Sequence, residues 1–185
     1  LLEKFSIKQL WLGIDFALGK NRSGNIDVLS AIGENKDFKI IDCPHIEDTN
    51  GKISSSQIRN WIKSGDFIST STSLNRYYSI EGLVISGDAR GRKIGFPTAN
   101  LDVWEGKLLP ISGVYATWIS FDNEVFPSVT NVGIRPTFEV QDNPKPRIEV
   151  HILNFDQNIY NKKVKLDFVE QIRLEKKFKS VEELV

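Results

Sequence analysis

The sequence predicts an α/β segment followed by an all-β domain of the antiparallel barrel or sandwich type. In the first 65 residues, short apolar runs alternate with a helical pattern. From Tyr78 onward, apolar residues recur with a period of two, and Gly, Pro and Asn turns separate the runs. Residues 68–76 are rich in Ser and Thr and have little to bury, so they are predicted to be a linker. We therefore expect two domains, residues 1–75 and 76–185.

The composition is typical of a soluble globular protein, with 40% hydrophobic and 26% charged residues among 185. A formal net charge of +0 argues against nucleic acid or an anionic membrane as a partner. Cys43 is the only cysteine, which excludes an intramolecular disulfide and fits a reducing cytoplasm. The chain begins at Leu1 and contains no methionine, so it is expected to be part of a longer protein.

The first domain is expected to contain two strands. An apolar run over residues 9–14 is followed by Asp15, and this pattern is typical of a buried strand with a polar carboxyl end. Residues 38–41 predict a second strand. Because ligands in open α/β sheets bind beyond the carboxyl ends of the strands, the cationic loop at residues 19–24 is expected to lie near such a site.

A helix is predicted to begin at Ser54 or Ser55 and to end at Gly65. Ser55 and Ser56 then lie at its N-terminus, where backbone N–H groups and the helix dipole favour phosphate, and Arg59 follows one turn later. Ordinary helix capping is the alternative interpretation of the same serines.

Strands of the second domain are expected over residues 80–85, 114–119, 125–132, 147–155 and 164–169. Ser180 and Glu183 form a capping box before apolar residues, which predicts that a helix begins near the end of the chain.

The segment over residues 91–101 combines two glycines, a proline and two cationic side chains with Thr98 and Asn100. Glycines allow a ligand to approach the backbone, and consecutive N–H groups in such a turn bind anions. The Thr98 hydroxyl and the Asn100 carboxamide oxygen are neutral ligands that suit Mg²⁺. A β-turn held by Pro97 and capped by Asn100 is the alternative. The glycine spacing does not match a Walker A loop.

The pattern Gly-Arg-x-x-Gly-Phe-Pro-Thr-Ala-Asn-Leu in this segment resembles that of riboflavin kinases, including the kinase module of bacterial bifunctional riboflavin kinase/FAD synthetases. The resemblance implies a closed six-stranded antiparallel Greek-key barrel with a C-terminal helix. It also implies ATP-dependent phosphorylation of riboflavin to FMN, with Mg²⁺ held by Thr98 and Asn100. The residues expected to bind the nucleotide and its phosphates are Gly87, Arg90, Gly91, Arg92, Gly95, Pro97, Thr98 and Asn100.

Glu149 is the candidate for the catalytic base. It alternates with Ile148 and Val150, so it points away from the face that those residues bury. A glutamate there is usually only solvated, but Glu149 matches the catalytic base of riboflavin kinases in the run Ile-Glu-Val-His-Ile-Leu-Asn-Phe. His151, on the same face, is expected to be a surface residue or to support the site.

The flavin is expected near the end of the last strand. Arg173, Glu175 and Phe178 match the family segment that flanks the flavin, and a charged loop with one buried Phe is the alternative. Residues 131–138 match another family motif and are interpreted as turn architecture beside the nucleotide loop.

The first domain resembles the later motifs of the FMN adenylyltransferase module of the same bifunctional enzymes. Ser55, Ser56 and Arg59 match its phosphate motif. The earlier motif with paired histidines has no counterpart, so this chain alone is not expected to adenylylate FMN, whereas the complete protein would make FAD. The rival functions are a non-catalytic flavin-binding barrel and a nucleic-acid-binding barrel. The oligomeric state is left open.

Overall fold

The computed structural model describes residues 4–48, 51–87, 95–134 and 146–176. The chain divides into two compact units, residues 1–53 and 54–185. Helices that precede the barrel belong to the second unit, so this division lies before the domain boundary expected at residue 75. None of the helices within the described residues has the length and apolarity needed to cross a membrane.

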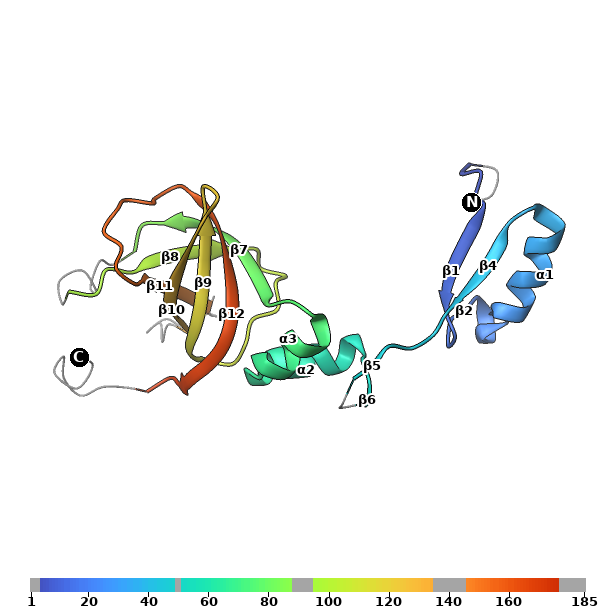
Figure 1. Cartoon of the computed structure of the whole chain (residues 1–185), viewed down its shortest axis with the longest axis horizontal. Helices are drawn as coiled ribbons and strands as arrows, with labels where there is room; N and C mark the ends of the chain where they lie inside the picture. The colour runs from blue at the N-terminus through green and yellow to red at the C-terminus, as the bar shows by residue number, and fades with distance from the viewer. Residues whose placement is uncertain (1–3, 49–50, 88–94, 135–145, 177–185) are drawn as a thin grey trace. The chain divides into compact units, whose positions relative to one another are not determined.

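The first unit is built on two parallel strands joined by a helix (Figure 1). Strand β1 (Gln9–Gly13) pairs with β4 (Lys39–Cys43), which confirms both expected strands. Helix α1 (Ile26–Lys36) was not predicted, although its signals are present: Asn25 Oδ1 accepts a hydrogen bond from the Val28 N–H, and Asp37 ends the helix in the left-handed region.

Short elements complete the first unit. Its remaining elements are β2 (Ala17–Leu18), η1 (Lys20–Arg22), β3 (Gly24–Asn25), β5 (Glu47–Asp48) and β6 (Gly51–Lys52). Strands β2 and β3 pair with each other, as do β5 and β6.

The second unit begins with helix α2 (Ser55–Ser64), which follows the predicted boundaries. The cap is Ser54, whose side chain accepts a hydrogen bond from the Gln57 N–H. The helix ends at Gly65, where φ is 83°. Glycine adopts this conformation without steric strain, so it terminates the helix as the sequence predicts.

The interpretation of residues 68–76 as a linker is wrong. Helix α3 (Phe67–Leu74) occupies most of this stretch and is capped by Asp66, which accepts a hydrogen bond from the Ser69 N–H. The hydroxyl of Thr70 donates to the Asp66 carbonyl oxygen, so a polar side chain is buried here with its hydrogen bond satisfied. Phe67 is only 1% exposed and packs on the barrel, so two side chains suffice to anchor a helix that is otherwise rich in Ser and Thr.

Six strands form a closed barrel in which every neighbouring pair is antiparallel, as expected (Figure 1). The order around the barrel is β10-β11-β8-β7-β12-β9. The strands are β7 (Tyr78–Ile85), β8 (Ala99–Val103), β9 (Gly113–Phe121), β10 (Glu124–Ile134), β11 (Pro146–Ile152) and β12 (Lys163–Leu174). The expected C-terminal helix falls on residues outside the described part of the chain.

Two differences from the predicted strands affect the site. Strand β8 was not predicted as a strand, because it is only five residues long and lies in a segment rich in turn residues. The strand expected over residues 147–155 ends at Ile152, and residues 153–162 form a loop instead. A third difference is that residues 133 and 134, expected to be part of a turn, extend β10 beyond the predicted end of that strand at residue 132.

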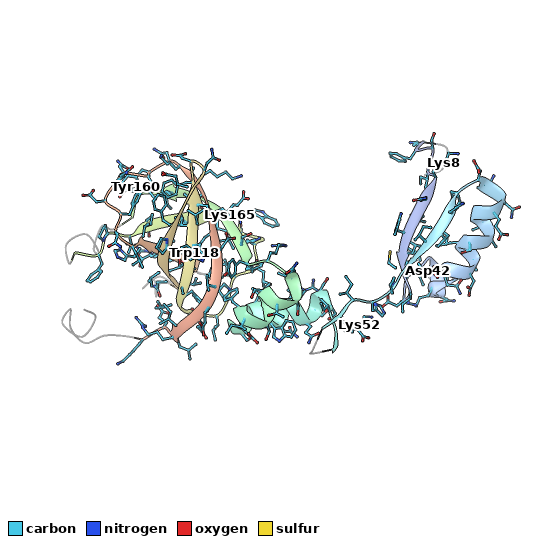
Figure 2. All side chains as sticks on the ribbon, viewed as in Figure 1. Lys8, Asp42, Lys52, Trp118, Tyr160 and Lys165 are labelled. Carbon is cyan, nitrogen blue, oxygen red and sulfur yellow. The ribbon has the colours of Figure 1, made fainter. Side chains whose placement is uncertain are left out.

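Alternation along the strands separates an apolar interior from the outer surface. Trp118 and Lys165, labelled in Figure 2, are exposed on β9 and β12, whereas their chain neighbours are more buried. Three hydroxyls also lie in the interior: Thr117 Oγ1 is 2.8 Å from both Ser128 Oγ and Thr130 Oγ1. Because each has a partner, these polar groups are buried without loss of hydrogen bonds. The buried apolar residues of the barrel strands are Ile80, Val84, Leu101, Tyr115, Ile119, Phe121, Val132, Ile148, Val150, Ile152, Val164, Leu166 and Phe168.

Candidate active site

Glu149 lies at the centre of three adjacent strands. It pairs with Asn100 of β8 on one side and with Asn131 of β10 on the other. Directly paired residues on antiparallel strands point to the same face of the sheet, and the neighbours Ile148 and Val150 are buried inside the barrel. The structure therefore brings the predicted base and the predicted metal ligand Asn100 together on the outer face.

Arg147 connects these two residues, and sequence reasoning did not single it out. Its Nη2 lies 2.8 Å from Glu149 Oε1, and its Nε donates a hydrogen bond of 3.0 Å to Asn100 Oδ1. The side chains of Arg147 and Glu149 are 29% and 27% exposed, so the ion pair is largely shielded from water. The one available sequence signal was the spacing of two residues on a single strand, which places both side chains on one face.

Gly87 lies against the Asn100 carboxamide. A Cβ atom at position 87 would be only 2.0 Å from Asn100 Nδ2, well inside van der Waals contact. The predicted nucleotide-binding glycine therefore leaves space for the side chain of the predicted metal ligand Asn100. Gly95 has a φ of 85°, the left-handed backbone that glycine favours. Arg90, Gly91 and Arg92 lie outside the described residues.

Replacing Gly87 with alanine is expected to lower at least tenfold the rate of riboflavin phosphorylation, the activity that the sequence resemblance implies, because the new methyl group displaces Asn100, which Arg147 holds in place. Steady-state kinetics and thermal unfolding would be measured together. The neighbouring exposed Ser86→Ala variant is the control and should keep the wild-type rate. An alanine variant that folds and retains full activity would show that the Asn100 position is unimportant.

The segment before β8 is tied to β11 through His151. His151 Nδ1 lies 2.8 Å from the Pro97 carbonyl oxygen, so this nitrogen carries the proton and donates it. The Phe96 ring meets the His151 ring edge-on, with 5.6 Å between centroids. His151 thus supports the backbone next to Thr98, in agreement with one of its two predicted roles.

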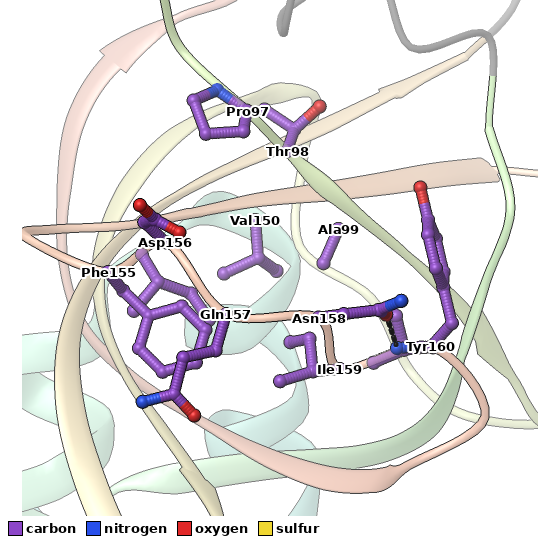
Figure 3. A pocket seen from close by; sticks show the side chains of 12 residues that line it. Pro97, Thr98, Ala99, Val150, Phe155, Asp156, Gln157, Asn158, Ile159 and Tyr160 are labelled. Carbon is purple, nitrogen blue, oxygen red and sulfur yellow. Dashed lines mark hydrogen bonds between the residues drawn. The ribbon is translucent and has the colours of Figure 1, made fainter.

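A pocket of about 450 Å³ opens beside Thr98 (Figure 3). Thr98 and Pro97 form part of one wall, and apolar side chains of the barrel, such as Val150 and Ala99, form the base. Neither Asn100 nor Glu149 lines it. The loop after β11 supplies the opposite wall with Phe155, Asp156, Gln157, Asn158, Ile159 and Tyr160.

This loop was also missed by sequence reasoning as part of the site. Asn161, near its end, has a φ of 63°, a left-handed conformation that asparagine tolerates better than most residues. Within the loop, Asn158 Oδ1 accepts a hydrogen bond of 2.9 Å from the Tyr160 N–H, drawn as a dashed line in Figure 3. This bond uses the amide oxygen of Asn158 and fixes the side chain at the pocket wall.

The predicted flavin-binding residues are divided between described and undescribed parts of the chain. Glu175 lies over the outer face, where its Oε1 would be 2.8 Å from a Cβ atom at Gly133. Gly133 pairs with Arg147, so the Glu175 carboxylate lies beside the strand pair that carries Glu149. Arg173 is exposed near the end of β12 and pairs with Val114. Phe178 lies outside the described residues.

The predicted adenylyltransferase residues occupy the first turns of α2. Ser55 and Ser56 are its first two residues, and Arg59 Nη2 lies 3.4 Å from Ser56 Oγ. In the first unit, Lys52 Nζ lies 3.1 Å from Asp15 Oδ2 and lowers the pKa of that carboxyl group through a hydrogen bond and its positive charge. Both carboxylate and ammonium are largely exposed, so this pair is a surface feature of the unit.

Two family models match the chain. A model described as riboflavin kinase matches residues 74–185, and one described as FAD synthetase matches residues 1–57. The first covers the barrel and the second covers the parallel strands and the start of α2, in agreement with the expected order of the modules.

Bacterial relatives match nearly the whole chain. The bifunctional riboflavin kinase/FMN adenylyltransferase of Bacillus subtilis is 37% identical over 93% of this chain and 54% of its own length. The protein of the same description from Pseudomonas fluorescens is 33% identical over 100% of this chain and 58% of its own length. The chain therefore spans a little over half the length of these curated relatives.

A solved structure has a fold similar to that of this chain. A crystal structure described as a macrolide-efflux protein from Streptococcus pneumoniae has a TM-score of 0.82 and 34% sequence identity. It covers 93% of this chain, while this chain covers 54% of it. Together with the barrel, the sequence motifs and the match over residues 74–185, these similarities show that the chain belongs to the riboflavin kinase family.

Proposed function

We propose that the barrel transfers the terminal phosphate of ATP to the 5′-hydroxyl of riboflavin and so forms FMN. The observation that carries this proposal is the direct pairing of Glu149 with Asn100, on the strand that continues from Thr98 at the pocket wall. Phosphoryl transfer needs an aligned hydroxyl, a group that takes its proton and neutralisation of phosphate charge. A non-catalytic flavin-binding barrel would need neither the carboxylate nor its amide partner.

In this mechanism Glu149 accepts the proton from the riboflavin hydroxyl as the oxygen attacks the terminal phosphorus. Its carboxylate is on a rigid strand between two neighbours, and Arg147 and Asn100 fix its surroundings. A general base is most effective when it is held within hydrogen-bonding distance of its target. The Glu175 carboxylate, over the same face, is placed to bind the polyol chain or ring edge of the flavin.

The pocket beside Thr98 is proposed to hold the nucleotide base. The apolar floor of the pocket and the aromatic rings of Phe155 and Tyr160 suit a flat heteroaromatic ring. Gln157 and Asp156 offer polar groups at the pocket wall. A base bound there extends its phosphates past Thr98 towards Asn100. The flavin would occupy the opposite side of Glu149, near Glu175.

The residues at this position fit a magnesium ion. Among the described residues no group of three or more His, Cys, Asp or Glu side chains could hold a metal, but Asn100, Thr98 and Glu149 offer hard oxygen atoms. The cationic Arg147 already contacts two of these oxygens. Bound Mg²⁺ would neutralise phosphate charge and orient the terminal phosphate, with Thr98 and Asn100 as its protein ligands.

Residues 1–75 are proposed to be the C-terminal part of an FMN adenylyltransferase module. Ser55, Ser56 and Arg59 would contact phosphate at the start of α2 in the complete protein, which would convert FMN to FAD. The substrates of the whole protein are then riboflavin, ATP and FMN, and we place it in the cytoplasm, where such metabolites are made.

Purified chain, riboflavin and Mg-ATP are expected to yield FMN and ADP in equal amounts, measured by chromatography. Thr98→Ala should lower the rate at least tenfold, because the hydroxyl at the pocket wall is lost. Protein that binds riboflavin tightly but forms no FMN with ATP would favour the flavin-binding barrel instead.

A further inference from the structure

The contacts of Arg147 point to a role that the proposed chemistry does not assign to it. One guanidinium group binds the acceptor atom of the predicted metal ligand, Asn100 Oδ1, and a carboxylate oxygen of the predicted base, Glu149. Both oxygens therefore contact the same positive charge. Any second cation at Asn100 Oδ1 would lie close to this guanidinium and be repelled by it.

We propose that the Arg147 guanidinium occupies the place at the Asn100 amide oxygen that the divalent cation of the nucleotide takes, so that the two cations exchange when Mg-nucleotide binds. This inference rests on the proposed kinase function. Arg147 is a positioning residue in this scheme, because it acts through Asn100 and Glu149 and is not assigned a contact with riboflavin or with the nucleotide.

The geometry allows the exchange. The Arg147 side chain is 29% exposed, so its charged group can move into water and is not left buried without a partner when it leaves Asn100. Its partner across the sheet on β10, Gly133, has no side chain, and the Glu175 carboxylate lies over that position, so the released guanidinium has an anionic neighbour towards which it can turn. After the exchange, Oε1 of Glu149 is released from the ion pair and can face the riboflavin hydroxyl.

The guanidinium also links the two side chains on neighbouring strands. A carboxylate and an amide on neighbouring strands would otherwise lack a common partner, and the planar fork of Arg reaches both at once. A lysine ammonium lacks this fixed fork, so it would hold the two groups less well.

The test measures cation binding without turnover. Mn²⁺ is titrated into protein and ADP, with no riboflavin present, and bound Mn²⁺ is followed by electron paramagnetic resonance. Arg147→Gln is expected to bind Mn²⁺ with ADP about fivefold more tightly than wild type, since loss of a partly shielded charge contact changes binding by about 1 kcal/mol. Arg147→Lys should also bind more tightly, by a smaller factor. Arg76→Gln, a matched change at an exposed arginine, should leave binding unchanged.

Equal or weaker Mn²⁺ binding by a folded Arg147→Gln variant would overturn the proposal, and weaker binding would assign Arg147 to the phosphates instead. If the glutamine variant does not fold, Arg147→Lys is judged by the same criterion. Turnover of riboflavin by the wild-type protein is measured separately. If the wild-type protein makes FMN while the Arg147 variants bind Mn²⁺ only as tightly as wild type does, the exchange is refuted and the kinase function stands.

Discussion

Replacing Glu149 with glutamine is expected to lower the turnover number for riboflavin phosphorylation by about 10²–10⁴-fold, the usual contribution of a general base. Glutamine keeps the length of the side chain and an oxygen that can accept from Arg147 Nη2, so Asn100 stays in place. The loss should therefore appear in the turnover number, with little change in KM for ATP. Initial rates of FMN formation at saturating substrates provide the measurement.

The matched control is Glu81→Gln. Glu81 also lies on an outer strand face of the barrel and pairs with a cation, Lys163, at 2.7 Å, but it is remote in the strand register from Asn100 and Glu149. This variant should keep the wild-type rate. If Glu149→Gln retained even a tenth of the wild-type turnover number, another group would have to accept the proton.

Replacing Phe67 with alanine is expected to reduce the free energy of unfolding of the second unit by about 3–5 kcal/mol, as for other buried aromatic residues. Its ring stacks on Phe168, with 4.7 Å between centroids, and meets Tyr115 edge-on at 5.5 Å. Removing the ring leaves a cavity between α3 and the barrel, because neighbouring side chains relax only in part. Urea unfolding followed by Trp fluorescence would give the change.

Ile68→Ala on the same helix is the control for Phe67→Ala. Ile68 is 60% exposed, so its truncation should change stability by less than about 0.5 kcal/mol. Similar small effects for both variants would mean that α3 does not anchor the barrel, and would restore the interpretation of this segment as a linker.

Much of the barrel could be predicted because its strands follow the simple alternation of buried and exposed residues. In β9, for example, Tyr115, Thr117 and Ile119 point inward between more exposed neighbours. Strand β8 escaped prediction because its five residues include Asn100 and Asp102, and because it becomes a strand only by pairing with β7 and β11. Local sequence carries little information about such long-range pairing.

Helix α3 was missed for a different reason. Five of its eight residues are Ser or Thr, which is typical of a linker, yet hydroxyls of this helix bond to carbonyl oxygens of the preceding turn, as Ser71 does to Ile68. Burial of Phe67 and Thr70 then stabilises a helix whose intrinsic propensity is weak.

At the site, the residue types were predictable but their connections were not. Glu149 and Asn100 were identified from motifs, and the strand register places them side by side. Arg147 carries no motif of its own and becomes significant only through that register. The loop that lines the pocket was missed for the same reason, since its role depends on how it folds over Val84 and Val150.

The contact between Arg147 and Asn100 joins positions 47 residues apart in the chain. During synthesis on the ribosome, the segment proposed to bind phosphate therefore emerges well before the strand that completes its surroundings. A nascent chain that stops short of β11 would contain the whole glycine-rich motif and still have no carboxylate opposite it. The proposed site would thus be completed late, after β11 has inserted between its two neighbours and β12 and Glu175 have followed.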